Sequence, residues 1–431
     1  MLKILKTAPY LCILGILITV DTTWAAENKP QLDTGDTAWL LTSTAIVLLM
    51  TIPGVALFYA GMARKKNVLS VLMQSFTITC LISIIWMVAG YSLAFSKGES
   101  AYVGNLDLAF LDHLTVGAIN GTIPDSLFVV FQMTFAVITA ALITGSLAER
   151  IKFSALLWFV GIWSIVVYSP VTYWVWGGGF LGDAGVLDFA GGTVVHINSG
   201  IAALVACVML GKRTGYGKEN LAPHNLVLTV IGGSLLWVGW FGFNAGSALG
   251  ANGGAAMAMT VTQIAAASAG LAWMLAEWTV QKKPTVLGVV SGAVAGLVAI
   301  TPAAGFVGPK GALAIGLLAG LICFWGATSL KHKLKYDDSF DVFAVHGLGG
   351  ITGAILTGVF AVEAIGGTAG ALEGNLSQIG TQLYGIIATI IWSAVATAVI
   401  IFVIDKTIGI RVDKDAESEG LDLNQHGEMI H

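Results

Sequence analysis

The chain has 431 residues, of which 56% are hydrophobic and only 11% are charged, and its mean hydropathy is +0.83. These values exclude an ordinary soluble globular protein and place the chain among multi-pass membrane proteins. The net charge of −4 excludes little, because in such proteins the distribution of charge matters more than its sum. The sequence shows no basic patch typical of nucleic-acid binding and no Cys and His spacing typical of zinc, so we expect no cofactor or metal.

The N-terminus has the pattern of a secretory signal peptide. Lys3 and Lys6 precede an apolar run from Tyr10 to Val20, and small residues follow it. The pattern predicts cleavage after Ala25, so that residues 1–25 are removed. The alternative is an uncleaved first helix, but the apolar run is too short to span a bilayer comfortably. Export of the mature N-terminus predicts a bacterial inner (plasma) membrane protein.

Beyond the leader, eleven apolar segments are long enough to cross a bilayer. They fall near 38–61, 68–95, 126–147, 153–173, 192–211, 225–246, 255–280, 285–303, 310–330, 339–362 and 381–404. The sequence therefore predicts an all-α membrane domain over residues 26–405. A short polar tail, residues 406–431, follows it and is predicted to be cytoplasmic.

The basic residues between these segments assign the sides of the membrane. With the mature N-terminus outside, the inner loops and the tail hold 16 Lys and Arg residues, whereas the outer segments hold only Lys29, Lys97 and Lys310. Inner loops of membrane proteins are enriched in Lys and Arg. The bias predicts an N-out, C-in topology with eleven helices.

Two histidines lie at bilayer depth, His196 in the fifth segment and His346 in the tenth. An ionisable group there is costly and normally faces a cavity or a functional path. The two segments run in opposite directions, so equivalent histidines indicate an inverted repeat of helices 1–5 and 6–10. The alternatives are a chance match and, for either histidine alone, a satisfied core residue.

Acidic residues near the helix ends have a structural interpretation and a functional one. Asp188 precedes the fifth segment, where its carboxylate can accept backbone N–H bonds at the helix start, and direct cation binding is the alternative. Asp341 is predicted to act similarly before the tenth segment. Glu149 and Glu277 lie at cytoplasmic helix ends near basic residues, where we expect pairing or snorkelling.

Aromatic side chains and one serine form a second candidate set. The faces of Trp176, Phe135, Trp240 and Phe243 could attract a partly dehydrated cation, and the hydroxyl of Ser247 could accept a hydrogen bond from it. The alternative is that these aromatic residues belong to the core or anchor the protein at the membrane interface, as most of the 13 Trp and 19 Phe residues would.

Several segments strongly resemble the ammonium transporter (Amt) family of the Amt/Mep/Rh superfamily, in its bacterial type. They are FYAGMARKKNVLS, SLAERIKFSA, WGGGFLGDAGVLDFAGGTVVHINSG, WFGFNAGSALGAN, DDSFDVFAVHGLGGITG and the tail sequence EGLDLNQHGE. The resemblance covers essentially the whole chain after the leader. It implies an eleven-helix inverted-repeat fold and a homotrimer in the lipid bilayer, each subunit with its own narrow pore.

The resemblance also implies roles for individual residues. Trp176, Phe135 and Ser247 match the outer ammonium-recruitment site, and Phe135 and Phe243 match the stacked phenyl gate below it. His196 and His346 match the twin pore histidines, Asp188 matches the structural acid, and Trp240 matches a tryptophan that lines the same path. A cytoplasmic regulatory protein of the PII type is the implied partner of the inner loops and the tail.

Chemistry agrees with this assignment, because ammonium and potassium ions are similar in size and charge but only ammonium can release a proton. A hydrophobic pore that penalises charge would pass ammonia and refuse potassium. We therefore expect an ammonium transporter and not an enzyme. The alternatives are an ammonium sensor that transports little, a Rh-type gas channel, and a redox protein whose paired histidines hold haem or copper.

Overall fold

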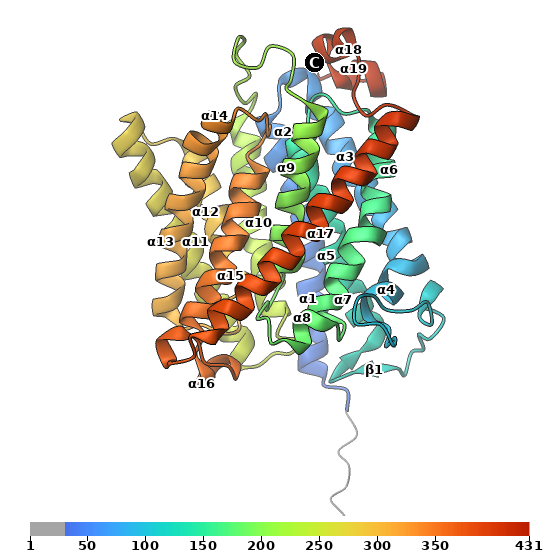
Figure 1. Cartoon of the computed structure of the whole chain (residues 1–431), viewed down its shortest axis with the longest axis vertical. Coiled ribbons are helices and arrows are strands. Elements are labelled where there is room, and N and C mark those ends of the chain that lie inside the picture. The colour runs from blue at the N-terminus through green and yellow to red at the C-terminus, as the bar shows by residue number, and fades with distance from the viewer. Residues whose placement is uncertain (1–30, 431) are drawn as a thin grey trace, which may run out of the picture.

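The structure is a computed structural model that describes residues 31–430. Figure 1 shows a bundle of helices, and the described residues contain one short hairpin, β1 (Ile119–Asn120) paired antiparallel with β2 (Ile123–Pro124). The predicted signal peptide, residues 1–25, lies outside the described residues.

Ten helical segments among the described residues are long and apolar enough to cross a membrane. They are Thr34–Met62, Lys65–Phe95, Asp125–Leu147, Phe153–Asp183, Gly192–Leu210, Leu226–Gly246, Gly253–Gln281, Pro309–Leu334, Phe343–Phe360 and Ser377–Thr407. Each coincides with one of the predicted apolar segments. The remaining prediction, 285–303, corresponds to the shorter apolar helix α12 (Val286–Ile300).

Most spans consist of α-helix joined to a π-helical turn. The α-helical parts are α1 (Thr34–Leu49), α2 (Ala56–Met62), α3 (Val68–Ile85), α4 (Tyr91–Phe95), α5 (Asp125–Leu147), α6 (Phe153–Trp163), α7 (Ser169–Trp176), α8 (Phe180–Asp183), α9 (Asn198–Leu210), α10 (Leu226–Gly246), α11 (Gly253–Gln281), α13 (Pro309–Trp325), α14 (Lys331–Leu334), α15 (Gly349–Phe360) and α17 (Ser377–Thr407). The π-helical turns are η1 (Met50–Val55), η3 (Trp86–Gly90), η5 (Ser164–Tyr168), η6 (Gly192–Ile197), η7 (Gly326–Leu330) and η8 (Phe343–Leu348).

Shorter elements begin, connect or follow the spans. They are the 3₁₀ turns η2 (Lys65–Asn67), η4 (Ala109–Leu111) and η9 (Ala371–Glu373), and the helices α16 (Glu363–Gly366), α18 (Lys414–Glu419) and α19 (Leu421–His426).

Helix α12 is short, and a proline follows its C-terminal end. At 15 residues it is about 22 Å long, less than the roughly 30 Å of a bilayer core. Pro302 follows, and its carbonyl accepts a hydrogen bond from the backbone N–H of Phe189 at 3.1 Å. A Cβ atom on Gly192 would lie 2.5 Å from the Pro302 ring, so the chain after α12 supports the start of η6.

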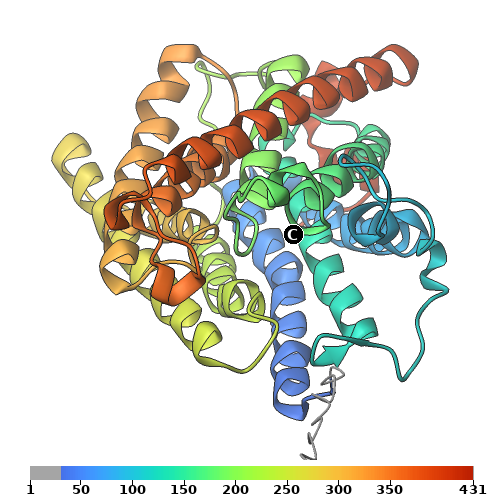
Figure 2. The ribbon, with the colours of Figure 1, turned by 60° about the horizontal axis from the view of Figure 1, so that its bottom comes forward.

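The long helix α17 lies obliquely across the outside of the bundle, over α15 and α9 (Figures 1 and 2). Helices α14, α18 and α19 lie at one end of the bundle, and β1, α8 and α16 lie at the opposite end (Figure 1). We call these the tail end and the hairpin end.

The polar tail is folded against the tail end of the bundle. The carboxylate of Asp422 accepts hydrogen bonds from the backbone N–H groups of Leu69 and Ser70, at 3.0 and 2.7 Å, in the first turn of α3. The side-chain oxygen of Gln425 accepts one from the backbone N–H of Phe153, at 2.6 Å, where α6 begins. The tail therefore satisfies N–H groups that have no partner within their own helices.

A buried ionic cluster joins the loops at the tail end. Glu149 pairs with Arg64 at 2.8 Å and with Arg213 at 3.2 Å, and Arg213 also pairs with Asp337 at 2.8 Å. Burial raises the pKa of Glu149, but the charges of Arg213 and Arg64 outweigh it and leave the pKa below its ordinary value. The predicted pairing of Glu149 is confirmed, whereas Glu277 accepts hydrogen bonds from the backbone N–H and hydroxyl of Thr285 instead.

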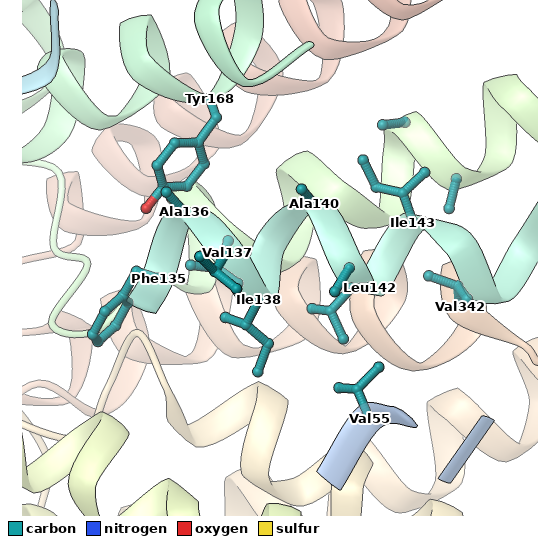
Figure 3. Packing of buried hydrophobic residues seen from close by; sticks show 14 of the residues in the cluster. Val55, Phe135, Ala136, Val137, Ile138, Ala140, Leu142, Ile143, Tyr168 and Val342 are labelled. Carbon is teal, nitrogen blue, oxygen red and sulfur yellow. The ribbon is translucent and has the colours of Figure 1, made fainter. Parts of the chain in front are cut away.

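Helix α5 runs through the middle of the core (Figure 3). Its side chains Ile138 and Leu142 point to the same side of the helix, toward Val55, and Phe135 lies nearer the N-terminal end of the helix. All of these residues are buried. Because 19 of its 23 residues are buried, α5 is surrounded by other helices.

The fifth and tenth spans cross closely at the histidines. A Cβ atom on Gly200, in α9, would overlap the backbone nitrogen of Gly347, in η8. Glycine at this crossing lets the two backbones touch, as small residues do between membrane helices. The close approach brings the neighbouring side chains, His196 and His346, within reach of each other.

Candidate functional site

The two predicted histidines are in direct contact at the centre of the molecule. The Nδ1 atoms of His196 and His346 lie 3.1 Å apart, and their rings are nearly parallel with centroids 5.2 Å apart. Both side chains are buried, and each belongs to a π-helical turn at the start of its span, η6 and η8. Such turns often occur at functional sites, because they change which residues face inward.

A contact between two Nδ1 atoms requires opposite tautomers in the neutral pair. A neutral imidazole has one N–H donor and one bare acceptor nitrogen, so one ring donates from Nδ1 and the other accepts. The Nε2 atom of the donating ring is then an acceptor, and the other Nε2 is a donor. The Nε2 atom of His196 has no partner among the described residues, so it is free to bond a molecule in the cavity beside it.

A stacked pair of phenyl rings separates the histidines from the hairpin end. The ring centroids of Phe135, on α5, and Phe243, on α10, are 4.2 Å apart with an interplanar angle of 28°. Phe243 also lies against His196, at 6.0 Å between centroids, and both phenylalanines are fully buried. Together the two rings close the space between the histidine pair and the cavity above it.

That cavity, which we call the outer cavity after the predicted topology, has a volume of about 350 Å³ and lies beside the first half of α5. Three predicted site residues line it: Phe135, Trp176 and Ser247. The other lining residues were not predicted from the sequence: Phe95, Phe128, Gln132, Val175, Phe189 and Leu249. Trp176 stands edge-on to Phe135 with ring centroids 6.0 Å apart, so the cavity floor is aromatic.

Asp188 holds two parts of the site in place through hydrogen bonds. Its carboxylate accepts four backbone hydrogen bonds, of 2.6 to 3.0 Å, from the consecutive N–H groups of residues 191–194. These are donors at the start of the fifth span, so the acid holds the turn that leads to His196. The backbone carbonyl of Asp188 accepts a hydrogen bond of 2.8 Å from the indole N–H of Trp176, which fixes that ring.

Two further predicted residues are held by neighbouring polar groups. The indole N–H of Trp240 donates to the hydroxyl of Thr301 at 2.9 Å, and its ring stacks on His196 with centroids 5.4 Å apart. The hydroxyl of Ser247 donates to the backbone carbonyl of Phe243 at 2.8 Å. Since its hydrogen is engaged, this oxygen faces the outer cavity as an acceptor.

Two more cavities continue the series beyond the phenyl pair. A central space of about 10 Å³ touches both histidines, Trp240, Phe243, Phe58 and Tyr59. A cavity of about 130 Å³, which we call the inner cavity after the predicted topology, shares Phe58, Tyr59 and His346 with the central space and reaches Thr285, between α11 and α12. The three spaces therefore follow one another through shared or stacked lining residues, and the central space at the histidines is the smallest of the three.

The acid at the start of the tenth span is Asp338 and not the predicted Asp341. The Asp338 carboxylate accepts the backbone N–H of Phe343 at 2.8 Å, whereas Asp341 pairs with the amine of Lys331 at 2.7 Å and lines the inner cavity. Burial raises the pKa of Asp338 to about 6. Asp338 lies eight residues before His346, as Asp188 lies eight before His196, so equal spacing could have identified it.

Among the described residues, no group of three or more His, Cys, Asp and Glu side chains is placed to hold a metal ion. The long apolar helices and the line of central cavities define a multi-pass membrane protein whose interior could admit a small molecule.

Comparison with known proteins is consistent with this class. The model of the Ammonium Transporter Family matches residues 38–431. An ammonium transporter of Aquifex aeolicus is 48% identical over 97% of this chain and 98% of its own length, and one of Bacillus subtilis is 49% identical over 92% and 98%. The crystal structure of Candida albicans Mep2 is 38% identical with a TM-score of 0.84 and covers 93% of this chain and 90% of its own. A structure titled Sensor Amt Protein is 29% identical with a TM-score of 0.85, over 91% and 98%.

The chain therefore belongs to the ammonium transporter family, within the Amt/Mep/Rh superfamily. The predicted family is confirmed. This is a family of transporters and channels and not of enzymes.

Proposed function

We propose that this protein transports ammonium, by binding the cation in the outer cavity, removing its proton and conducting ammonia past the histidine pair. The observation that carries the proposal is the histidine contact itself, which lies behind a closed phenyl pair and between two cavities. Family membership and the named relatives support ammonium as the substrate.

Recruitment uses groups that favour a cation without carrying a charge. The aromatic faces of Trp176 and Phe135 attract ammonium by roughly 0.5–2 kcal/mol. Ser247 supplies an acceptor oxygen for one of its N–H bonds. Because these groups are neutral, they offset only part of the free energy that ammonium loses on dehydration. The ion is therefore bound weakly in the outer cavity and can leave it.

Deprotonation makes the passage selective. Moving an intact cation through the buried phenyl and histidine region would cost several kcal/mol, and the cost is the same for potassium. Ammonium can release H⁺ and continue as neutral ammonia, which bonds to the imidazole nitrogens as donor and acceptor. We propose that the paired imidazoles also relay the proton, so that ammonia and H⁺ reach the inner side together and uptake is electrogenic.

The same proposal includes the membrane arrangement. Counting α12 as the eighth span, we propose eleven helices with the N-terminus outside, the tail in the cytoplasm, and an inverted repeat of helices 1–5 and 6–10. Matching features support the repeat: acids eight residues before each histidine, π-helical turns η6 and η8 in spans five and ten, and η5 and η7 in spans four and nine.

We further propose, on the family resemblance, a homotrimer in a bacterial inner membrane whose inner loops and tail receive a PII-type regulatory protein. In this arrangement the outer cavity faces the outside and the inner cavity faces the cytoplasm. The basic loops and the tail lie at the same end of the bundle, as the proposal requires (Figure 1).

The test is the current that follows an ammonium pulse applied to proteoliposomes on a solid support, with potassium as the control ion. We expect a transient charge movement with ammonium and none with potassium. A current with potassium of equal size would contradict selective transport.

A sensor that transports little is the second candidate, because the chain resembles a structure titled Sensor Amt Protein. A Rh-type gas channel would conduct ammonia without charge movement. Internal alkalinisation without current would indicate the gas channel, and neither signal would indicate the sensor.

A further inference from the structure

Leu249 is a leucine with a left-handed backbone, and it has no role in the mechanism above. Its φ is +53°, in the region that favours glycine because the Cβ atom of an L residue is crowded by the backbone there. It lies in the turn between α10 and α11, two residues after Ser247. Leucine has no polar group that could offset the cost of this conformation by a local hydrogen bond, as Asn and Asp have. The backbone alone therefore favours glycine at this position.

The turn that contains Leu249 is fixed by hydrogen bonds on both sides. The backbone N–H of Leu249 donates to the carbonyl of Gly246 at 2.9 Å. Two residues later, the N–H of Ala251 donates to the carboxylate of Asp36, on α1, at 2.7 Å. The hydroxyl of Thr122 donates to the other oxygen of Asp36. These bonds hold the turn in place around a residue whose own conformation is unfavourable.

Leu249 is one of the residues that line the outer cavity, together with Ser247, Trp176 and Phe135. It is half-buried and also packs against the core. Residues with strained backbone persist where the surrounding structure holds them, and they gather at ligand sites where the strained position serves the ligand. A glycine would relieve the backbone but would leave the cavity without this apolar group beside its acceptor oxygen.

We propose that Leu249 is a specificity-determining residue, whose isobutyl group limits the size of the cation that fits against Ser247 and the aromatic faces. This inference rests on the proposed function. Methyl groups on the nitrogen enlarge an ammonium ion without changing its charge, so cation–π attraction alone does not reject such an ion. A side chain that would clash with the larger ion does reject it.

The same apolar group also favours the smaller ion. By occupying space beside Ser247, it displaces water from the cation. Attraction between a cation and an aromatic face is stronger where both are desolvated than where they are exposed. Leu249 therefore strengthens ammonium binding without adding a charge or a hydrogen bond, and removal of its side chain should weaken that binding.

A second leucine with a left-handed backbone provides a matched control. Leu111 has a φ of +60°, lies in the loop between α4 and α5, and is likewise half-buried and packed against the core. It is not among the residues that line the outer cavity. If backbone strain or packing were the whole role of Leu249, the same substitution at both positions would have the same effect on transport.

The test compares Leu249→Ala with Leu111→Ala in full-length protein reconstituted in proteoliposomes. Alanine keeps the Cβ atom, and with it the backbone cost, but removes the rest of the side chain. We expect Leu249→Ala to raise the half-saturating ammonium concentration about fivefold, with a plateau current within twofold of wild type. Tetramethylammonium, which has no proton to release, should inhibit the ammonium current at a concentration about tenfold lower than in the wild type. Leu111→Ala should change neither quantity.

Two further variants keep the proposal testable if Leu249→Ala does not fold. Leu249→Gly relieves the backbone and removes the side chain, so it should reproduce both changes while its unfolding temperature equals or exceeds that of the wild type. Leu249→Met keeps an apolar side chain of similar size and should restrict tetramethylammonium as the wild type does. Unchanged tetramethylammonium inhibition in Leu249→Ala or Leu249→Gly, or equal changes in Leu111→Ala, would overturn the inference.

Failure of the proposed function gives a different pattern. Wild-type protein that binds ammonium but shows neither current nor alkalinisation would overturn transport. Calorimetry of ammonium and tetramethylammonium binding to the purified full-length variants would then still decide the role of Leu249. Wild-type protein that transports ammonium, with unchanged inhibition in Leu249→Ala, would overturn only the inference.

Discussion

The outer cavity is lined by aromatic and neutral polar side chains, whereas the inner cavity also contains the carboxylates of Glu277 and Asp341. The outer one is larger, about 350 Å³ against about 130 Å³. Neutral acceptors and aromatic faces discriminate by hydrogen-bond geometry, while carboxylates attract any cation. Under the proposed function, selection is assigned to the outer cavity, and the inner cavity receives ammonia and its proton.

The largest effect on the ammonium current is expected from substitution of the histidine pair, which lies between the two cavities. The double variant His196→Ala/His346→Ala removes both imidazoles from the central space, where the remaining polar groups, the Tyr59 hydroxyl and the Trp240 indole N–H, donate to the Leu142 carbonyl and the Thr301 hydroxyl. We expect the ammonium-specific current to fall more than 100-fold, or potassium to be carried as well. Unchanged ammonium-specific currents in the double variant would refute the role of the pair.

A smaller effect is expected in the outer cavity. Trp176→Leu removes one aromatic face, so the half-saturating ammonium concentration should rise about tenfold, within the range of a cation–π contribution. The control is Trp158→Leu, because Trp158 is 62% exposed on the outside of the bundle. If both variants behave alike, the aromatic face of Trp176 has no part in binding.

A substitution in the inner cavity should change the plateau current and not the half-saturating ammonium concentration. Glu277→Gln keeps an acceptor for the hydroxyl of Thr285 but removes the charge. Since Glu277 lies beyond the histidines, we expect an unchanged half-saturating concentration and a plateau current reduced less than threefold. A tenfold change in the half-saturating ammonium concentration would show that the inner cavity also takes part in selecting the ion. It would contradict the contrast drawn between the two cavities.

The smallest effect is expected at the tail end, where a lower pH should reduce hydrogen-exchange protection. Because the pKa of Glu149 is below its ordinary value of 4.5 in the folded protein, its ionisation stabilises the fold above that value. That stability is lost as the pH falls through the folded-state pKa. We expect the hydrogen-exchange protection of residues 211–217 to fall several-fold between pH 6 and pH 3.5, while Glu149→Gln protein starts less protected and changes less. Equal pH dependence in both proteins would contradict this.

The sequence predicted the spans well because the length of an apolar segment directly reflects the membrane thickness. It did not predict that α12 is shorter, although Pro302, which disfavours helix at Thr301, was an available signal. His196 and His346 were identifiable because an ionisable residue in an apolar span is rare.

Gln132 was missed because an uncharged amide in a span has no such contrast with its neighbours. Its place on one face with Phe128 and Phe135 was the available signal. Asp338 was confused with Asp341 because both precede the tenth span, although its spacing of eight residues from His346, equal to that of Asp188 from His196, was an available signal. Residue identity therefore located the centre of the site, and three-dimensional contacts were needed for its walls.

The docked tail has an energetic consequence for any regulator that uses it. A partner that binds the tail in a released form competes with the hydrogen bonds that Asp422 and Gln425 make to the starts of α3 and α6. Two helix caps of about 1 kcal/mol each make the released form about thirtyfold rarer, and they weaken the partner's apparent affinity by the same factor. A partner that recognises the docked tail avoids this penalty and, by linkage, strengthens the fold it binds.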